Sequence, residues 1–89
     1  MNELEFVNIF KTLGNRKRFQ ILRLLKREKE ISVGVIASEI RLSFKATSKH
    51  LSLLLRVGLV EYENRQNKVF YRLLNSDQPL VNLLLKRFV

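Results

Sequence analysis

The chain has 89 residues, with 17 Lys and Arg against 8 Asp and Glu, so its formal net charge is +9. This length allows one domain and argues against two. The 46% content of hydrophobic residues is ordinary for a folded domain, so the charge does not signal disorder. The excess positive charge favours an anionic partner, with nucleic acid first and a membrane surface second.

Several functions are excluded by what the sequence lacks. It contains no cysteine and one histidine, which leaves no disulfide, no thiolate ligand and no site built from several imidazoles. We therefore expect no metal and no cofactor. The sequence shows no paired carboxylates, no nucleophile–base pair and no Gly-rich phosphate loop, so no feature of it indicates an enzyme. Uninterrupted apolar runs are far shorter than the roughly 20 residues that span a bilayer, and the N-terminus lacks a signal-peptide pattern. We expect a cytoplasmic protein without a membrane partner.

The first half of the chain predicts four helices. Apolar residues at three-residue steps predict a helix over 3–13 that ends at Gly14-Asn15. A strongly basic amphipathic helix follows from Arg16 to Lys26, and then a polar break over 28–30. Ser32 is placed to cap a short third helix, and Arg41-Leu42 forms a tight turn. Ser43 is placed to cap a fourth helix that ends at Gly58.

The second half predicts a β-hairpin and a last helix. Residues 59–62 and 69–73 are rich in β-branched and aromatic residues, and the polar loop 63–68 joins them. Ser76 or Asp77 caps the last helix, over 77–89, with Pro79 in its first turn. The predicted fold is a single domain over 1–89, mainly α with a small β-hairpin (α+β), in the order α-α-α-α-β-β-α.

Residues 32–57 form a candidate helix-turn-helix. The second helix must bury one face and project the other into a major groove about 12 Å wide. Residues 41–58 contain four basic residues and no acid, as such a face requires. The simpler alternative is a solvated basic face on an ordinary helix. The basic tip of the hairpin that follows favours nucleic acid, because a compact arm reaches the neighbouring minor groove or backbone. The predicted DNA contacts are Arg41, Ser43, Phe44, Lys45, Thr47, Ser48, Lys49 and His50, with Arg65, Gln66 and Lys68 on the hairpin.

Three motifs resemble the ArsR-type winged-helix repressors. Residues 13–22 are similar to the pattern LG-x-x-x-R-x-x-IL of the family's second helix. Residues 48–60 are similar to S-x-HL-x-x-L-x-x-x-GLV, and 71–73 to the closing YRL of the wing. The resemblance covers about residues 4 to 74. It implies a winged helix-turn-helix and a dimeric transcriptional repressor that pairs through its first and last helices, with recognition helix 43–57 in the major groove and wing 61–73 near the minor groove.

The chain departs from this family at its metal ligands. Many members bind metal through a Cys-x-Cys in the third helix, where this chain has Ser32 and Gly34. Other members use Asp and His residues of the last helix, where this chain has Asp77 but no His. The resemblance therefore does not carry the family's metal sites onto this chain.

Five residues keep alternative interpretations. His50 makes either a structural hydrogen bond or a phosphate contact, and Phe44 either packs in the core, which we favour, or touches a thymine methyl. Lys45 and Lys49 contact guanine edges or phosphates. Arg18 matches the Arg of the family motif, and its purely structural role would be to pack its stem across the domain and pair with an acid such as Glu39.

The terminal helices carry more apolar area than so small a core needs. We expect the surplus to form a two-fold interface that sets two recognition helices about 34 Å apart. The predicted interface residues are Leu4, Phe6, Val7, Phe10, Leu80, Leu83, Leu84 and Phe88. The leading interpretation is a homodimeric, sequence-specific regulator of transcription that binds double-stranded DNA. The alternative is a winged-helix module for RNA or protein contact without operator binding.

Overall fold

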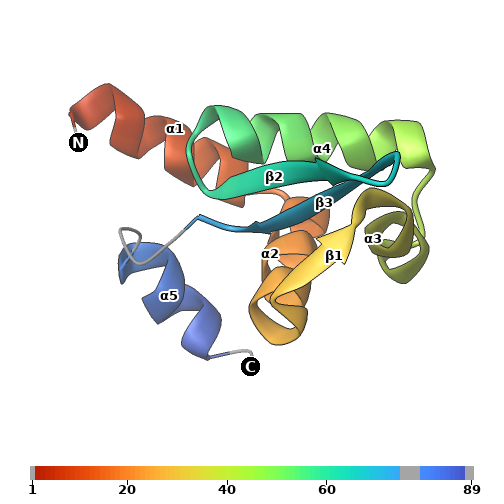
Figure 1. Cartoon of the computed structure of the whole chain (residues 1–89). Coiled ribbons are helices and arrows are strands. Elements are labelled where there is room, and N and C mark those ends of the chain that lie inside the picture. The colour runs from red at the N-terminus through yellow and green to blue at the C-terminus, as the bar shows by residue number, and fades with distance from the viewer. Residues whose placement is uncertain (1, 75–78, 88–89) are drawn as a thin grey trace.

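The computed structural model describes residues 2–74 and 79–87 and contains five helices and three strands. In chain order these are α1 (Glu3–Leu13), α2 (Arg16–Glu28), β1 (Glu30–Ser32), α3 (Val33–Ile40), α4 (Phe44–Arg56), β2 (Val60–Arg65), β3 (Lys68–Leu73) and α5 (Pro79–Lys86). The sheet runs along α4, α2 crosses behind it, and α1 and α5 lie at the end of the molecule away from α3 (Figure 1). The fold is a winged helix-turn-helix, mainly α with a small antiparallel sheet, as the sequence predicts.

Side chains just before the helices fix where four of them begin. The side-chain oxygens of Asn2, Asn15, Ser32 and Ser43 accept hydrogen bonds from backbone N–H groups in the first turns of α1, α2, α3 and α4. The predicted caps at Asn15, Ser32 and Ser43 are thus confirmed. Gly58 follows α4 with a φ of 76°, a left-handed conformation that glycine adopts without the penalty a Cβ brings. These local signals explain why the helix boundaries could be found from sequence.

The core lies between α2 and the helix-turn-helix. Leu22 and Leu25 of α2, Ile36 of α3, and Leu51 and Leu54 of α4 are fully buried in one cluster. Leu85 of α5 joins the same cluster. Because α2 packs against α3, α4, α5 and the sheet, it forms the support on which the helix-turn-helix is mounted.

The structure corrects the expected sheet in two ways. A strand that was not predicted, β1, begins at the last residue of the predicted polar break and pairs antiparallel with β3, so the sheet has three strands in the order β1-β3-β2. The predicted six-residue loop is a two-residue turn, Gln66-Asn67, with positive φ at both positions. Such a turn matches the twist of the flanking strands, so β2 continues to Arg65 and β3 begins at Lys68.

The last helix ends earlier than predicted, at Lys86. Pro79, predicted to lie in its first turn, is the first of its described residues. The proposed caps Ser76 and Asp77, and the interface residue Phe88, lie outside the described residues. Leu80 lies on α5, but its side chain is outside the described part of the chain.

Candidate nucleic-acid interface

The turn between α3 and α4 is tight and is tied to α2. Arg41 adopts the left-handed conformation (φ 59°, ψ 48°), and its N–H donates to carbonyls of α3. The Nζ of Lys17 donates to the carbonyl of Ile40 at 2.6 Å. Because this bond joins the first turn of α2 to the last residue of α3, α4 leaves the turn in a fixed direction. The predicted tight turn at Arg41-Leu42 is confirmed, and it holds Arg41 in a conformation that is uncommon for a residue other than glycine.

The two faces of α4 differ as the periodicity predicts. Leu51 and Leu54 are buried, whereas Lys45, Lys49 and Arg56 are exposed. Ser43 is exposed, and Ser48 and His50 are half-buried at the border between the two faces. The exposed face therefore presents hydroxyls and three cations, and no acid lies between residues 41 and 58.

Two predictions on this helix are wrong. Thr47 does not reach the surface: its side chain is fully buried on the same side as Leu51, so it cannot contact DNA directly. Phe44 does not pack in the core, because it is 61% exposed at the first position of the helix. An exposed phenyl ring beside Lys45 belongs to the outward face, where apolar contact with a thymine methyl is an accepted form of base readout.

His50 is fixed by Arg18 of α2. The Nη1 of Arg18 lies 3.2 Å from Nδ1 of His50, and its Nε donates to the carbonyl of Thr12 at 2.7 Å. An arginine only donates, so Nδ1 of His50 accepts and the imidazole is neutral in this arrangement. Arg18 therefore joins the end of α1 to the recognition helix, and the expected pairing with Glu39 is wrong.

This contact predicts a pH-dependent stability. Burial lowers the pKa of His50, and the nearby charges of Arg18, Lys17 and Lys49 lower it further. Between that lowered pKa and the ordinary value of about 6.5, the unfolded chain binds a proton that the folded chain does not. The free energy of unfolding should therefore fall as pH drops from 7.5 to 5.5, measured by urea unfolding.

The His50→Gln variant should show a smaller fall over the same range. Glu30 does not affect this comparison. Its pKa is lowered, so its contribution to the free energy of unfolding is lost only in solutions more acidic than this range. Equal slopes for the wild type and the variant would remove His50 as the cause.

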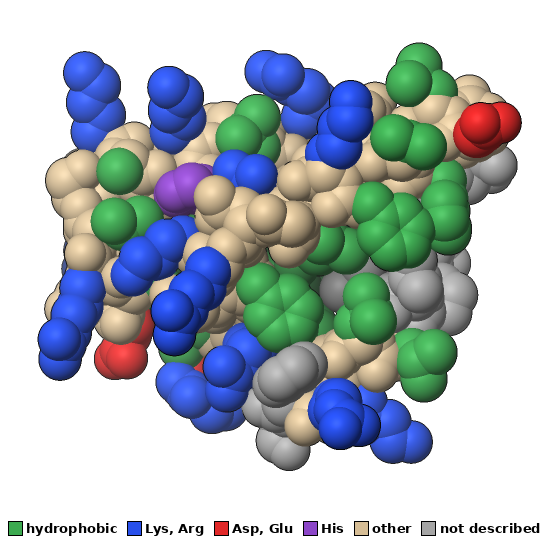
Figure 2. Space-filling view, turned by 180° about the vertical axis from the view of Figure 1, so that it is seen from behind, with side chains coloured by type: hydrophobic (Ala, Val, Ile, Leu, Met, Phe, Trp, Pro, Cys, Tyr) green, Lys and Arg blue, Asp and Glu red, His purple; other side chains and the backbone are tan. Residues whose placement is uncertain are grey.

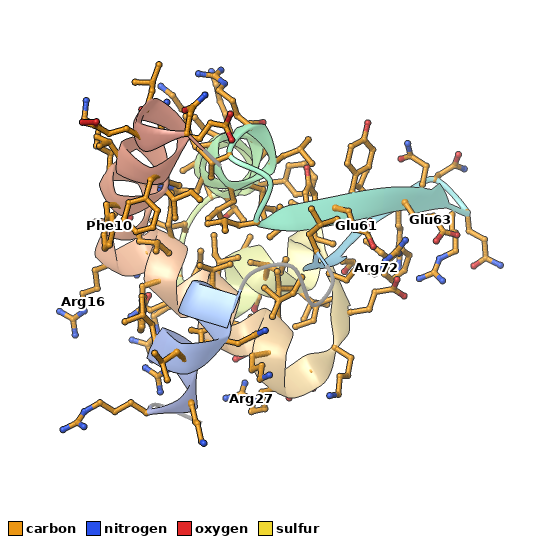
Figure 3. The ribbon with its side chains drawn as sticks, turned by 90° about the vertical axis from the view of Figure 1, so that its left-hand side faces the viewer. Phe10, Arg16, Arg27, Glu61, Glu63 and Arg72 are labelled. Carbon is orange, nitrogen blue, oxygen red and sulfur yellow. The ribbon has the colours of Figure 1, made fainter. Side chains whose placement is uncertain are left out.

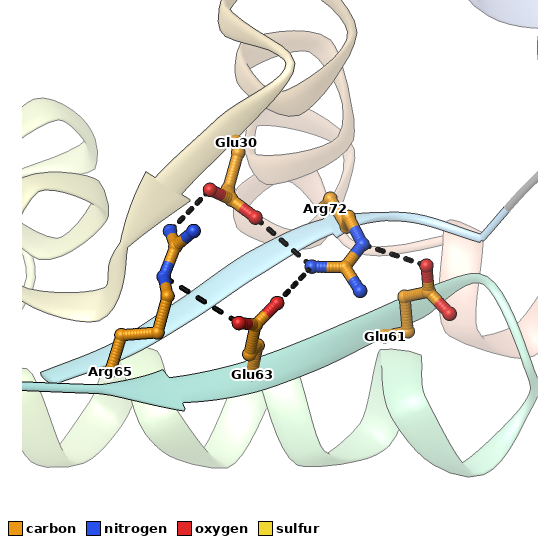
Figure 4. Close-up of polar contacts among 5 residues, drawn as sticks. All are labelled: Glu30, Glu61, Glu63, Arg65 and Arg72. Carbon is orange, nitrogen blue, oxygen red and sulfur yellow. Dashed lines mark hydrogen bonds and ion pairs between the residues drawn. The ribbon is translucent and has the colours of Figure 1, made fainter.

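The outer face of the wing carries a closed network of charges (Figure 4). Arg72 binds Glu61 at 2.8 Å, Glu30 at 3.0 Å and Glu63 at 3.3 Å. Arg65 pairs with Glu30 and lies 3.8 Å from Glu63. The hydrogen bond from Arg65 is the main reason that the pKa of Glu30 lies below its ordinary value, and Arg72 adds to it. The outer face of the wing thus holds three carboxylates against two guanidinium groups.

This network changes the role expected of Arg65. Its guanidinium also stacks on Phe70, with its Cζ 4.3 Å from the ring centroid. It must give up some of these contacts to reach a phosphate. Gln66 and Lys68, which flank the tip, are exposed. Sequence reasoning missed Glu30 and Arg72 because they are 42 residues apart, and only the pairing of β1 with β3 brings them together.

A separate apolar surface lies at the end of the molecule away from α3 (Figure 1). Exposed hydrophobic side chains gather over α1 and α5, with basic side chains at the edge of this surface and over much of the rest of the same view (Figure 2). Phe10 of α1 lies on the opposite side from Glu61, Glu63 and Arg72 of the wing (Figure 3). The predicted interface residues that the structure describes are all at least partly open to solvent: Leu4, Phe6, Val7, Phe10, Leu83 and Leu84.

Two other kinds of site can be checked directly. Within residues 2–74 and 79–87, no group of three His, Asp or Glu side chains is placed to hold a metal ion. No helix among these residues is long and apolar enough to cross a membrane.

A basic, acid-free helix presented beside a wing defines a winged helix-turn-helix DNA-binding protein, and sequence comparison supports that class. Residues 13–63 match the family described as a helix-turn-helix domain. Over 86 residues the chain is 37% identical to the transcriptional activator HlyU of Vibrio cholerae, covering 97% of this chain and 79% of HlyU.

Solved structures agree with this relationship. HlyU from Vibrio cholerae superposes with a TM-score of 0.84 at 34% identity, covering 99% of this chain and 98% of that one. The homodimeric winged helix-turn-helix DNA-binding domain Mb0332 from Mycobacterium bovis gives 0.84 at 29% identity, covering 94% and 78%. The repressor BigR from Xylella fastidiosa gives 0.80 at 32%, covering 94% and 83%. The chain belongs to the ArsR family of winged helix-turn-helix proteins and is a DNA-binding transcriptional regulator.

Proposed function

We propose that this protein is a homodimeric repressor that binds a two-part DNA operator, with α4 in the major groove and the wing tip near the minor groove. The observation that carries the proposal is the exposed face of α4, where Lys45, Lys49 and Arg56 stand with no acid among residues 41–58. A face without carboxylates approaches phosphates without like-charge repulsion. The proposed contacts are Arg41, Ser43, Phe44, Lys45, Ser48, Lys49, Gln66 and Lys68. His50 joins them through its Nε2–H, which remains a donor while Nδ1 accepts from Arg18, and Arg65 joins them in competition with its carboxylate partners.

The dimer is proposed from the apolar surface of α1 and α5, with residues 3–13 and 77–89 as the pairing helices of a single domain. The solved neighbour Mb0332 is homodimeric, which supports this arrangement. We propose a cytoplasmic location and no catalytic activity by analogy with the transcriptional regulators to which the chain is similar. We also propose that no transition metal is bound, because the sequence has no thiol and one imidazole. Repression rather than activation follows the family resemblance and BigR, although the relative HlyU is an activator.

The test compares two charge variants of equal size. Lys45→Gln/Lys49→Gln removes two cations from α4, whereas Lys86→Gln/Arg87→Gln removes two at the C-terminal end of α5. Sedimentation first establishes that both variants assemble like the wild type. If the dimer neutralises about eight phosphates, log K against log salt should have a slope near −7 for the wild type. The α4 variant should lose about 3 to 4 units of that slope, and the α5 variant should lose little.

The measurement is fluorescence anisotropy with duplexes selected from a random library. Selection of a shared base pattern supports operator binding. Tighter binding of a structured RNA than of any selected duplex would support the alternative, a module for RNA contact. A wild-type slope near zero, or equal slopes for both variants, would contradict the proposed recognition surface.

A further inference from the structure

A second basic feature lies beside the helix-turn-helix and is not part of the recognition face. A groove of about 330 Å³ separates α2 from the turn between α3 and α4. Its polar lining comprises Lys17, Gln20, Arg23, Arg27, Glu39 and Arg41. Four cations of the lining therefore stand against Glu39 and against Glu28, which pairs with Arg27 at 2.9 Å, and the remaining excess of positive charge favours an anion in the groove.

The cations are arranged in a line rather than a ring. Lys17, Gln20, Arg23 and Arg27 follow one another at three- and four-residue steps, so they lie along one side of α2. From Lys17 to Arg27 this stripe is about 15 Å long, at 1.5 Å per residue. Phosphates of one DNA strand follow each other every 3.4 Å or so along the duplex axis. The stripe is long enough to meet several successive phosphates, whereas a single small anion would occupy only part of it.

The groove is continuous with the recognition surface. Arg41 lines the groove and also forms the turn that precedes α4. Lys17 is held at the same junction by its 2.6 Å hydrogen bond to the carbonyl of Ile40. An anion that binds both cations would therefore bridge α2 and the turn, and would reinforce the contact that orients α4.

The groove also lies on the outer flank of the proposed dimer. α3 and the turn after it stand at the end of the molecule opposite the start of α1 and opposite α5 (Figure 1). If two copies pair through α1 and α5, the two grooves point outward from the two-fold axis. The DNA they meet lies beyond the two recognition helices.

We propose that the groove between α2 and the α3–α4 turn binds the phosphate backbone of DNA that flanks the two recognition-helix contacts. This inference rests on the DNA contact of α4 proposed above and extends the footprint of the protein outward. Arg23 and Arg27 are the residues that belong to this groove alone, whereas Arg41 also belongs to the recognition surface.

The test uses the full chain and two duplex lengths that share the same selected centre. A duplex of about 18 base pairs covers two half-sites one helical turn apart, and one of about 40 base pairs adds flanking DNA on both sides. Arg23→Gln/Arg27→Gln is compared with Lys86→Gln/Arg87→Gln, which loses the same charge from α5. Circular dichroism and sedimentation first establish that both variants fold and assemble like the wild type.

On the long duplex, the groove variant should lose about 3 to 4 units of salt slope, since four phosphate contacts disappear per dimer. On the short duplex it should bind like the wild type, and the α5 variant should match the wild type on both. A loss of equal size on both lengths, or no loss on either, would overturn the groove assignment while leaving operator binding by α4 intact. Failure of the wild type to bind either duplex would instead overturn the proposed function.

A small-anion site is distinguished by competition. Pyrophosphate, added at constant ionic strength, should weaken the wild type and the groove variant equally on the short duplex if the groove serves DNA. If pyrophosphate releases the wild type from the short duplex but does not release the groove variant, the groove holds a small anion and the proposal is overturned.

Discussion

Replacing Leu4 and Leu83 with glutamate should split the dimer into folded monomers and weaken binding to a two-part operator by about 10²- to 10⁴-fold. Both side chains are 68% exposed in the single chain, so the substitutions leave its core intact. In the proposed dimer each would bury a carboxylate against apolar side chains of the partner, which is strongly unfavourable. The large loss of affinity arises because the second half-site is no longer bound by a linked subunit.

Sedimentation velocity measures the assembly, and anisotropy with the selected duplex measures the affinity. The matched control for assembly is Val35→Glu, because Val35 is also an exposed hydrophobic residue, 49% accessible, but lies on α3. This control should remain dimeric. A Leu4→Glu/Leu83→Glu variant that sediments as a dimer would show that α1 and α5 do not form the interface.

The local parts of the fold could be predicted from the sequence because their causes are local. Asn15, Ser32 and Ser43 cap the helices that follow them, and Gly58 takes the left-handed conformation that ends α4. The third strand could not be predicted in the same way. Residues 30–32 are too short to show a period, and they form a strand only because β3 offers its free edge.

The same distinction holds for the candidate site. The burial of Leu51 and Leu54 and the exposure of Lys45 and Lys49 follow from helical spacing. The pairing of Arg65 with Glu30 does not, because it depends on which strands become neighbours. Phe44 was misjudged for another reason: it lies at helical spacing from the buried Thr47 and Leu51, yet at the first position of α4 its side chain remains 61% exposed.

The structure also redistributes the net charge of +9. Sequence reasoning assigned positive charge to the recognition helix, the wing and α2 alike. On the outer face of the wing, however, Arg65 and Arg72 are balanced by Glu30, Glu61 and Glu63. The unbalanced charge therefore lies on α4 and along α2, and the wing contributes mainly through Lys68 at its tip. For this reason we expect the salt dependence of binding to respond more to α2 and α4 than to Arg65.

Two neighbouring leucines at the end of α4 allow a test of how strongly the position of this helix depends on packing against the core. Leu54 is fully buried in the core, whereas its neighbour Leu55 is 36% exposed. Leu54→Ala should lower the free energy of unfolding by about 2 to 5 kcal/mol, because it removes buried methyl groups and leaves a cavity. Leu55→Ala makes the same chemical change on the outer side and should cost less than about 1 kcal/mol.

Urea unfolding of both variants at one protein concentration measures the difference, since the concentration also sets the stability of a dimer. For a domain of this size, the Leu54 loss is a large fraction of a total of about 5 to 15 kcal/mol. DNA binding by the Leu54→Ala variant should also weaken near its unfolding midpoint. Leu54 holds the buried side of the same helix that presents Lys45 and Lys49. Equal costs for the two substitutions would mean that α4 is not seated on the core through Leu54.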